Sequence, residues 1–388
     1  MTLLTGLTEE GIEVPVQVDP AGRLVAEGLP GAKGDRGDPG EQGPPGIGQK
    51  GDKGDPGEQG PPGEQGPPGG GGGTAGPSTT AGKLWDLNSS PADNEWQAIC
   101  WSPDLSLFVA VSESGLGNRV MSSPDGITWT ARNSAVDSTW RSVCWSPDLS
   151  LFVAVGTPSF GLGAMTSPNG INWTYRSTPA QDGYRSVCWS PELSLFVAVA
   201  SGGSGGRVMT SPDGINWTAR ASAADNQWFS VCWSSDLSLF VAVANTGSGN
   251  RVMSSPDGIT WTARSSAADN GWLSVCWSPD LSLFVAVSDT GSGNRVMSSP
   301  DGITWTARSS AADNPWSSVC WSPDLSLFVA VGYGGTGNRV MTSPDGITWT
   351  ARSSARDNSW RCVCWSPDLS LFVAVSETGS GNRVMSSV

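Results

Sequence analysis

The sequence predicts an all-β protein in which a closed seven-bladed β-propeller follows a collagen-like triple helix. Two observations lead to this prediction. Glycine recurs at every third position from Gly28 to Gly46 and again from Gly48 to Gly69. Residues 81–388 are seven copies of a 44-residue unit with no remainder. The expected parts are an N-terminal segment (1–27), a Gly-X-Y stalk (28–69), a flexible Gly-rich linker (70–81) and the propeller (82–388).

The glycine period predicts a triple helix, because three polyproline-type chains wind together only where the residue nearest the axis is glycine. Proline pairs such as Pro44-Pro45 and Pro61-Pro62 fill several X-Y positions. One residue is missing from the period at Ile47, where we expect a local bend. At ~3 Å per residue the stalk would be on the order of 120 Å long. Because fewer chains cannot form this helix, the stalk predicts a homotrimer.

Each 44-residue copy is typical of a four-stranded propeller blade. In the copy that begins at Trp272 we expect strand A at 272–277, strand B at 282–287, strand C at 295–298 and strand D at 303–308. Strand B is apolar on both faces, as a strand packed between neighbouring blades should be. Strand D alternates apolar and polar residues, as an outer strand should. Ser-Pro-Asp-Leu and Ser-Pro-Asp-Gly predict tight A–B and C–D turns.

The ends of the repeat predict how the ring closes. The last copy stops at Val388, before its strand D, and residues 83–88 supply an additional strand D at the front. Trp85 lies 11 residues before Trp96, as Trp129 lies 11 residues before Trp140. We expect the N-terminal strand to complete the last blade and so to remove the open sheet edges. The closure could occur within one chain or by exchange between chains of the trimer.

Composition excludes several classes of function. The chain has 22 basic and 36 acidic residues, a net charge of −14, and no histidine. No segment is basic enough to follow nucleic acid, and no apolar run approaches the ~20 residues of a membrane helix. We therefore expect no nucleic-acid partner and no membrane insertion. The lack of histidine removes the commonest metal ligand and general base. No cofactor or metal site is predicted, although Gly-Asn-Asp loops without EF-hand spacing leave calcium binding open.

The cysteines do not predict disulfides. Seven of the eight recur at a spacing of 44, from Cys100 to Cys364, and Cys362 is the additional one. One thiol per copy differs from a disulfide framework, in which the spacings vary. We expect each to be a small buried residue in strand A. Cys362 and Cys364 lie two apart on one strand face, where they are poorly placed to bond each other. Free thiols suit synthesis in a reducing cytoplasm.

The segment Ser-Pro-Asp-Gly-Ile-Thr-Trp at 123–129, with its copies, resembles the Asp-box (BNR-like) repeat of sialidase-like propellers. That motif places an Asp and a Gly in a C–D hairpin and buries the following aromatic residue, here Asp125, Gly126 and Trp129. Asn169 replaces the Asp in one copy, and the spacing is one residue tighter than in the usual box. The resemblance implies the hairpin and the propeller, and does not extend to ancestry.

The order of parts resembles that of a bacteriophage tail fibre or receptor-binding protein. The resemblance implies a virion fibre that is made in the host cytoplasm. Residues 1–27 would attach to a virion tail or baseplate protein, and the propeller would bind a glycan or protein receptor on the host surface, with glycan the favoured ligand. Two alternatives stay open. The chain could be a passive structural spike whose propeller only ends the fibre, or a sialidase-like glycan hydrolase.

The residues disfavour the hydrolase. Sialidases of the Asp-box class use an Arg triad, a Tyr nucleophile with a Glu, and an Asp acid, each of which breaks the repeat symmetry. Here Tyr184 replaces the first aromatic residue of strand A, and Tyr175 replaces an Ala of strand D. No paired carboxylates outside the repeat pattern stand out as acid and base. We predict no catalytic residues and no enzymatic activity.

Differences between the copies predict where a ligand binds. A meander places the A–B and C–D turns on one face, which we call the constant face because its sequence hardly changes between copies. The B–C and D–A loops lie on the other, varied face, and exposed loops are where function is free to change. The alternative is that unrestrained loops drift. The candidate ligand-binding residues are Glu95, Gln97, Thr139, Arg141, Phe160, Tyr184, Arg185, Gln227, Phe229, Leu273, Tyr333 and Arg361.

Periodic tryptophans and arginines accompany these positions. The chain has 20 Trp, and pairs such as Trp96 and Trp101 recur along it, a pattern typical of a core between blades. The first of each pair lies nearer the varied face and is the better candidate for a surface on which a ligand stacks. Arg119, Arg132 and their copies should also lie toward that face. There they could pair with loop acids such as Asp137 or meet anionic sugars.

Overall fold

The structure is a computed structural model that describes residues 80–387 except 160–161, 181 and 204–205, together with three short N-terminal strands. Those strands, β1 (Leu4–Leu7), β2 (Glu13–Val18) and β3 (Leu24–Val25), form one antiparallel sheet in a unit separate from the propeller. The predicted stalk and nearly all of the predicted linker lie outside the described residues. Among the described residues, no helix is long and apolar enough to cross a membrane.

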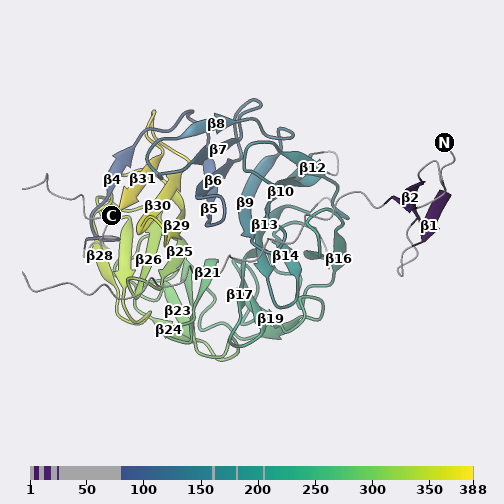
Figure 1. Cartoon of the computed structure of the whole chain (residues 1–388). Coiled ribbons are helices and arrows are strands. Elements are labelled where there is room, and N and C mark those ends of the chain that lie inside the picture. Colours follow the sequence, from purple (N-terminus) through teal and green to yellow (C-terminus); the bar gives the residue numbers. More distant parts are fainter. Residues whose placement is uncertain are drawn as a thin grey trace, which may run out of the picture. The chain divides into compact units, whose positions relative to one another are not determined.

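Seven four-stranded antiparallel sheets surround a common centre, so the predicted seven-bladed propeller is confirmed (Figure 1). Strand A of each blade is innermost and strand D outermost. The first blade consists of β5 (Trp96–Ser102), β6 (Leu107–Ser112), β7 (Val120–Ser123) and β8 (Thr130–Arg132). The second consists of β9 (Thr139–Ser146), β10 (Leu151–Ser159), β11 (Leu162–Ser167) and β12 (Thr174–Arg176). The third consists of β13 (Tyr184–Ser190), β14 (Leu195–Ala200), β15 (Val208–Ser211) and β16 (Thr218–Arg220).

The remaining blades repeat this order. The fourth consists of β17 (Trp228–Ser234), β18 (Leu239–Ala244), β19 (Val252–Ser255) and β20 (Thr262–Arg264). The fifth consists of β21 (Trp272–Ser278), β22 (Leu283–Ser288), β23 (Val296–Ser299) and β24 (Thr306–Arg308). The sixth consists of β25 (Trp316–Ser322), β26 (Leu327–Gly332), β27 (Val340–Ser343) and β28 (Thr350–Arg352). The seventh consists of β29 (Trp360–Ser366), β30 (Leu371–Ser376), β31 (Val384–Ser387) and β4 (Asp86–Asn88).

The seventh blade joins the two ends of the repeat region, as the sequence predicts. β4 pairs antiparallel with β31, with Leu87 opposite Met385. The Gly82 N–H donates to Ser387 Oγ at 2.7 Å. Trp85 is buried in the cluster that contains Trp365 and Phe372. The first strand of the propeller therefore closes the ring within one chain of this structure.

The hydrophobic core consists of separate clusters, each of which lies between two neighbouring blades. Strand B is buried on both faces because its alternate residues belong to different clusters. Phe108 and Ala110 pack in one cluster, while Val109 and Val111 pack against Trp140 of the second blade. Burying apolar area on both sides of every blade stabilises the ring by the hydrophobic effect. The expectation that the cysteines are fully buried is wrong: all eight are unpaired and half-buried, and Cys100, for example, packs against the cluster between the first two blades.

Strand D is shorter than the sequence predicts. In the fifth blade it covers Thr306–Arg308, and Ile303 is 45% exposed in the turn before it. The Asp301 carboxylate causes this difference, because its Oδ1 accepts hydrogen bonds from the N–H groups of Ile303 and Thr304 at 2.8 and 2.7 Å. Those N–H groups are held in the turn and do not pair with strand C. In the second blade, the Asn169 side-chain oxygen accepts the equivalent two bonds.

On the constant face, hydrogen bonds between side chains also join neighbouring blades. The Trp101 Nε1–H donates to Asp368 Oδ2 in the A–B turn of the seventh blade at 2.9 Å. The Trp145 Nε1–H donates in the same way to Asp104 of the first blade, and the pattern continues through all seven blades. The acid of each A–B turn, expected only to close the turn, therefore also anchors the next blade. This second function accounts physically for why that face varies so little.

Candidate binding site at the centre of the ring

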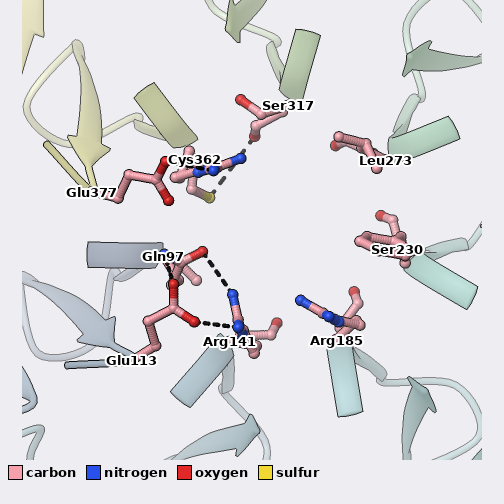
Figure 2. Close-up of a pocket in the computed structure, with 16 residues that line it drawn as sticks. Gln97, Glu113, Arg141, Arg185, Ser230, Leu273, Ser317, Cys362 and Glu377 are labelled. Atoms are coloured by element: carbon pink, nitrogen blue, oxygen red, sulfur yellow. Dashed lines mark hydrogen bonds and ion pairs between the residues drawn. The ribbon is translucent and has the colours of Figure 1, made fainter. Parts of the chain in front are cut away.

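A pocket of about 290 Å³ lies at the centre of the ring, and all seven blades line it (Figure 2). Each blade contributes the residue that follows the first aromatic residue of strand A. We call these seven residues the inner ring: Gln97, Arg141, Arg185, Phe229, Leu273, Ser317 and Arg361. Six of them are among the predicted ligand-binding residues. Two carboxylates from B–C loops, Glu113 and Glu377, complete the wall.

A β-bulge in every blade turns the inner ring toward the pocket. In the first blade Trp96 pairs with Ser112 and Ala98 pairs with Val111, so Gln97 is the extra residue on strand A. The same shift occurs in each of the other blades. Because a bulge breaks the alternation of side chains, two consecutive residues can face the same way. Both Gln97 and Ala98 consequently line the pocket.

The second residue of each bulge forms a belt that joins the blades. We call it the serine belt: Ala98, Ser142, Ser186, Ser230, Ser274, Ser318 and Cys362. Each Ser hydroxyl oxygen accepts a hydrogen bond from the N–H of a Val in the next blade, as Ser142 does from Val187 at 3.1 Å. Five of the seven belt positions are Ser, whereas the inner ring contains five residue types. The belt is therefore structural, and the inner ring carries the differences.

One half of the pocket is charged. Arg141 forms an ion pair with Glu113, and its guanidinium donates to Gln97 Oε1 at 3.4 Å. In the seventh blade, next to the first, Arg361 forms an ion pair with Glu377. Figure 2 shows Glu113 and Glu377 on the same side of the pocket. Burial raises the pKa of Glu113, and Glu95 and Glu377 raise it further, while Arg141 pulls it down.

The other half combines two apolar inner-ring residues with one arginine and several serines. Phe229 and Leu273 occupy adjacent inner-ring positions. Arg185 stands next to them, with its guanidinium carbon 4.9 Å from the centre of the Phe229 ring. Its Nε–H donates to Ser201 Oγ at 2.8 Å. Burial lowers the pKa of Arg185 to about 10, and the positive charges of Arg141 and Arg361 lower it too, while Glu113 opposes them.

Tyr333 lies beside the inner ring. The Tyr333 hydroxyl donates to Asp289 Oδ2 at 2.9 Å, and the Arg361 guanidinium carbon lies 4.4 Å from the centre of the Tyr333 ring. Burial, followed by the nearby Asp289 carboxylate, raises the pKa of Tyr333 to about 12. The Tyr333 ring therefore packs against the Arg361 guanidinium, and the Tyr333 hydroxyl stays protonated at neutral pH. It does not line the pocket itself.

Four other predicted residues lie away from the pocket wall. Glu95 and Gln227 are exposed, and their backbone carbonyls accept hydrogen bonds from the N–H groups of Glu113 and Asn245. Thr139 is half-buried. Tyr184 is fully buried, so its side chain cannot contact a ligand. Phe160 lies outside the described residues.

The expectation that the first Trp of each pair offers a stacking surface is wrong. Trp96 and its copies are fully buried. The Trp96 Nε1–H donates to the Ala92 carbonyl four residues earlier, a bond that recurs in five other blades. The bulge explains this position, because it turns the following residue toward the pocket while the aromatic residue stays between the blades. Tyr184 fills the same place in the third blade.

The repeated arginines of the varied face hold loops in place. Arg119 forms an ion pair with Asp137 at 3.4 Å and donates to the Gly115 carbonyl at 2.8 Å. Equivalent ion pairs occur in five other blades. The second blade has Gly163 and Gln181 at these two positions, so both partners are replaced together. Arg132 instead donates to Ser122 Oγ at 2.8 Å. The prediction that Arg119 pairs with a loop acid is confirmed.

Sequence reasoning missed Glu113 and Glu377. Both lie 16 residues after the inner-ring residue of their own blade, at the start of the B–C loop. The residues at this position differ in nearly every copy: Glu113, Thr157, Ser201, Asn245, Asp289, Tyr333 and Glu377. This variation was the signal that could have identified them. Among the described residues, no cluster of three or more acidic or thiol side chains could hold a metal ion.

The fold is similar to those of solved structures. A streptogramin B lyase structure matches with a TM-score of 0.66 and 9% identity, over 78% of this chain and 96% of that chain. A chain of the mitotic checkpoint complex matches with a TM-score of 0.59 and 16% identity, over 80% and 92%. The β-propeller domain of Cps50 (Swd1) from Myceliophteria thermophila matches with a TM-score of 0.57 and 10% identity, over 79% and 100%. No protein-family model and no curated protein matches the sequence. At these identities the likeness shows the fold alone, that of a seven-bladed β-propeller.

Proposed function

We propose that this chain is a trimeric fibre protein of the tail-fibre type, whose propeller binds a host-surface receptor at the pocket in the centre of the ring. The collagen-like period of residues 28–69 supports the trimer. A surface glycan is the receptor that fits best, because the pocket is the size of a small-molecule site and combines polar groups with an apolar wall. Residues 1–27 would attach to a tail or baseplate protein of the virion.

The asymmetry of the inner ring carries this proposal. The seven copies are nearly identical in the Trp, Val, Cys and Trp of strand A, yet the residue turned into the pocket changes between copies. Drift of exposed residues is a weaker account, because the changed residues interact with one another. Arg141 pairs with Glu113 of the neighbouring blade, and Arg361 contacts Tyr333 of another. Groups that match across blades support a surface shaped for a ligand.

We propose binding without catalysis. Both pocket carboxylates, Glu113 and Glu377, are engaged by arginines. The Tyr333 hydroxyl donates to Asp289 and lies outside the pocket lining. A glycoside hydrolase needs one carboxyl group that protonates the leaving group and a second that acts as base or nucleophile. Carboxylates neutralised by fixed guanidinium groups suit a recognition surface better than these catalytic functions.

A glycan array probed with the full-length protein tests the proposal, with mass spectrometry of the bound glycans after incubation. We expect binding to a restricted set of glycans, without any change in their mass. Trimerisation should raise the apparent affinity ~100-fold or more over that of the propeller alone, because three linked sites act together. Absence of binding to every surface glycan and to whole cells would favour the passive spike. A shortened glycan product would favour the hydrolase.

A further inference from the structure

Arg185 differs from the other two arginines of the pocket because no carboxylate neutralises it. Arg141 and Arg361 each form an ion pair, whereas the described residues offer Arg185 only Ser201 Oγ and the face of Phe229. The Ser201 bond uses the Nε–H. The N–H groups on the two terminal nitrogens of Arg185 therefore have no partner among the described residues. A guanidinium presents such groups as a planar fork that matches the two oxygens of a carboxylate or phosphate.

The surroundings of Arg185 favour an anion. The pocket contains three arginines and two glutamates, a net charge of +1 in a chain whose net charge is −14. Arg141 and Arg361 act on Arg185 as like charges, Glu113 opposes them, and the described residues give Arg185 no ion pair of its own. Figure 2 shows the Arg185 side chain reaching into the pocket beside Arg141. A bound anion would supply the missing partner.

The groups next to Arg185 limit what else the ligand carries. Phe229 and Leu273 form an apolar surface on one side of it, and Ser230 and Ser274 line the pocket next to them. Aromatic side chains stack well on the apolar faces of sugar rings because both surfaces are flat and weakly hydrated. The volume of about 290 Å³ suits one compact ring rather than an extended chain.

We infer that the pocket binds the terminal unit of an acidic saccharide, with its anionic group on the terminal nitrogens of Arg185 and its apolar face on Phe229 and Leu273. This inference rests on the proposed function, since it names the class of glycan that the same site takes. Carboxylate and phosphate groups both carry the negatively charged oxygens that match the guanidinium. A neutral sugar of the same shape has no such group.

The experiment measures binding of small probes to the full-length protein by isothermal titration calorimetry. The probes are glucuronic acid, its methyl ester, glucose 6-phosphate and glucose. We expect glucuronic acid, glucose 6-phosphate or both to bind at least ~10-fold more tightly than the ester and glucose, as is typical for loss of a charge-assisted hydrogen bond. The preferred acid identifies the anionic group. If neither anionic probe binds more tightly than its neutral counterpart, the ester or glucose, or if none of the probes binds, the inference is overturned.

Substitutions test whether the anionic group binds at Arg185. R185Q should weaken acid binding at least ~10-fold, and R185K should lose less because it keeps the charge but not the fork. The matched control is R264Q, since the Arg264 Nε–H donates to Ser254 Oγ at 2.9 Å as Arg185 does to Ser201, but on outer strand β20. F229A should weaken acid binding by removing the apolar wall. Equal losses in R185Q and R264Q, with both melting at the wild-type temperature, would contradict the assignment.

The small-probe titration and the glycan array test two different claims, and their results distinguish an error in one claim from an error in the other. If the acids bind through Arg185 but no surface glycan or cell is bound, the pocket assignment stands and the proposed receptor function is wrong. If the protein binds only neutral glycans on the array, the receptor function stands and the acidic ligand is wrong.

Discussion

Replacing Trp85 with Ala should lower the free energy of unfolding of the propeller by about 3–5 kcal/mol, the loss typical of a buried Trp in a core. Trp85 is 8% exposed, packs against Phe372 at 6.4 Å between ring centres, and donates from Nε1 to the Gly82 carbonyl. It is the side chain by which the first strand is held in the last blade. Unfolding in urea followed by circular dichroism measures the effect.

Leu84 is the control, because it lies in the same segment and is 67% exposed. Leu84→Ala should change stability by no more than ~0.5 kcal/mol. Deleting residues 83–88 should destabilise more than W85A and promote self-association, since it exposes the edge of β31. If W85A and L84A have the same stability, the first strand does not hold the ring closed.

Replacing Gly258 with Ala should also be strongly destabilising. Gly258 is at φ +70°, and a Cβ there would lie 2.9 Å from Val197 Cγ2 and 3.0 Å from Leu195 Cδ2, both in the preceding blade. The left-handed backbone costs an L-residue about 1–2 kcal/mol, and crowding a packed contact adds about 1–3 kcal/mol. Gly258 therefore lies where the C–D turn of the fourth blade contacts the preceding blade.

Gly249 of the same blade separates these two contributions. It has φ +69°, yet nothing lies within 4 Å of its Cβ position. Gly249→Ala should incur only the backbone cost, so G258A should melt at a clearly lower temperature than G249A. Equal melting temperatures would mean that the contact of the C–D turn at Gly258 does not stabilise the packing between blades.

The number of blades and the closure of the ring could both be predicted by counting residues along the sequence. The exact repeat of 44 residues set the number of blades, and the position of Trp85 relative to Trp96 predicted the closure. The start of strand D could not be predicted from alternation, because Ile303 fits the pattern while the Asp301 carboxylate holds its N–H in a turn. A hydrogen bond from a side chain to the backbone leaves no trace in hydrophobic periodicity.

The site was predicted in part, for a related reason. Comparison of the copies identified Gln97, Arg141 and four other inner-ring residues, because their variation is visible in one sequence. The comparison also selected Glu95, which precedes the first aromatic residue of strand A, and Tyr184, which is that aromatic residue in the third blade. Only the bulge decides which of three consecutive residues faces the pocket, and a bulge depends on the register with strand B. Pairings such as Arg141 with Glu113 cross between blades and follow only from the ring geometry.

Binding of the full-length protein to its array-selected glycan, compared between F229A and D257N, tests the central claim most directly. Phe229 lines the pocket, and Asp257 accepts hydrogen bonds within a C–D turn on the constant face. Asn keeps the side-chain oxygen that accepts the turn bonds, as Asn169 does in the second blade. A receptor bound at the centre of the ring on the varied face predicts that F229A loses most binding at an unchanged melting temperature, while D257N binds as the wild type does. Loss of binding in D257N with retention in F229A would place the receptor on the opposite face and contradict the account.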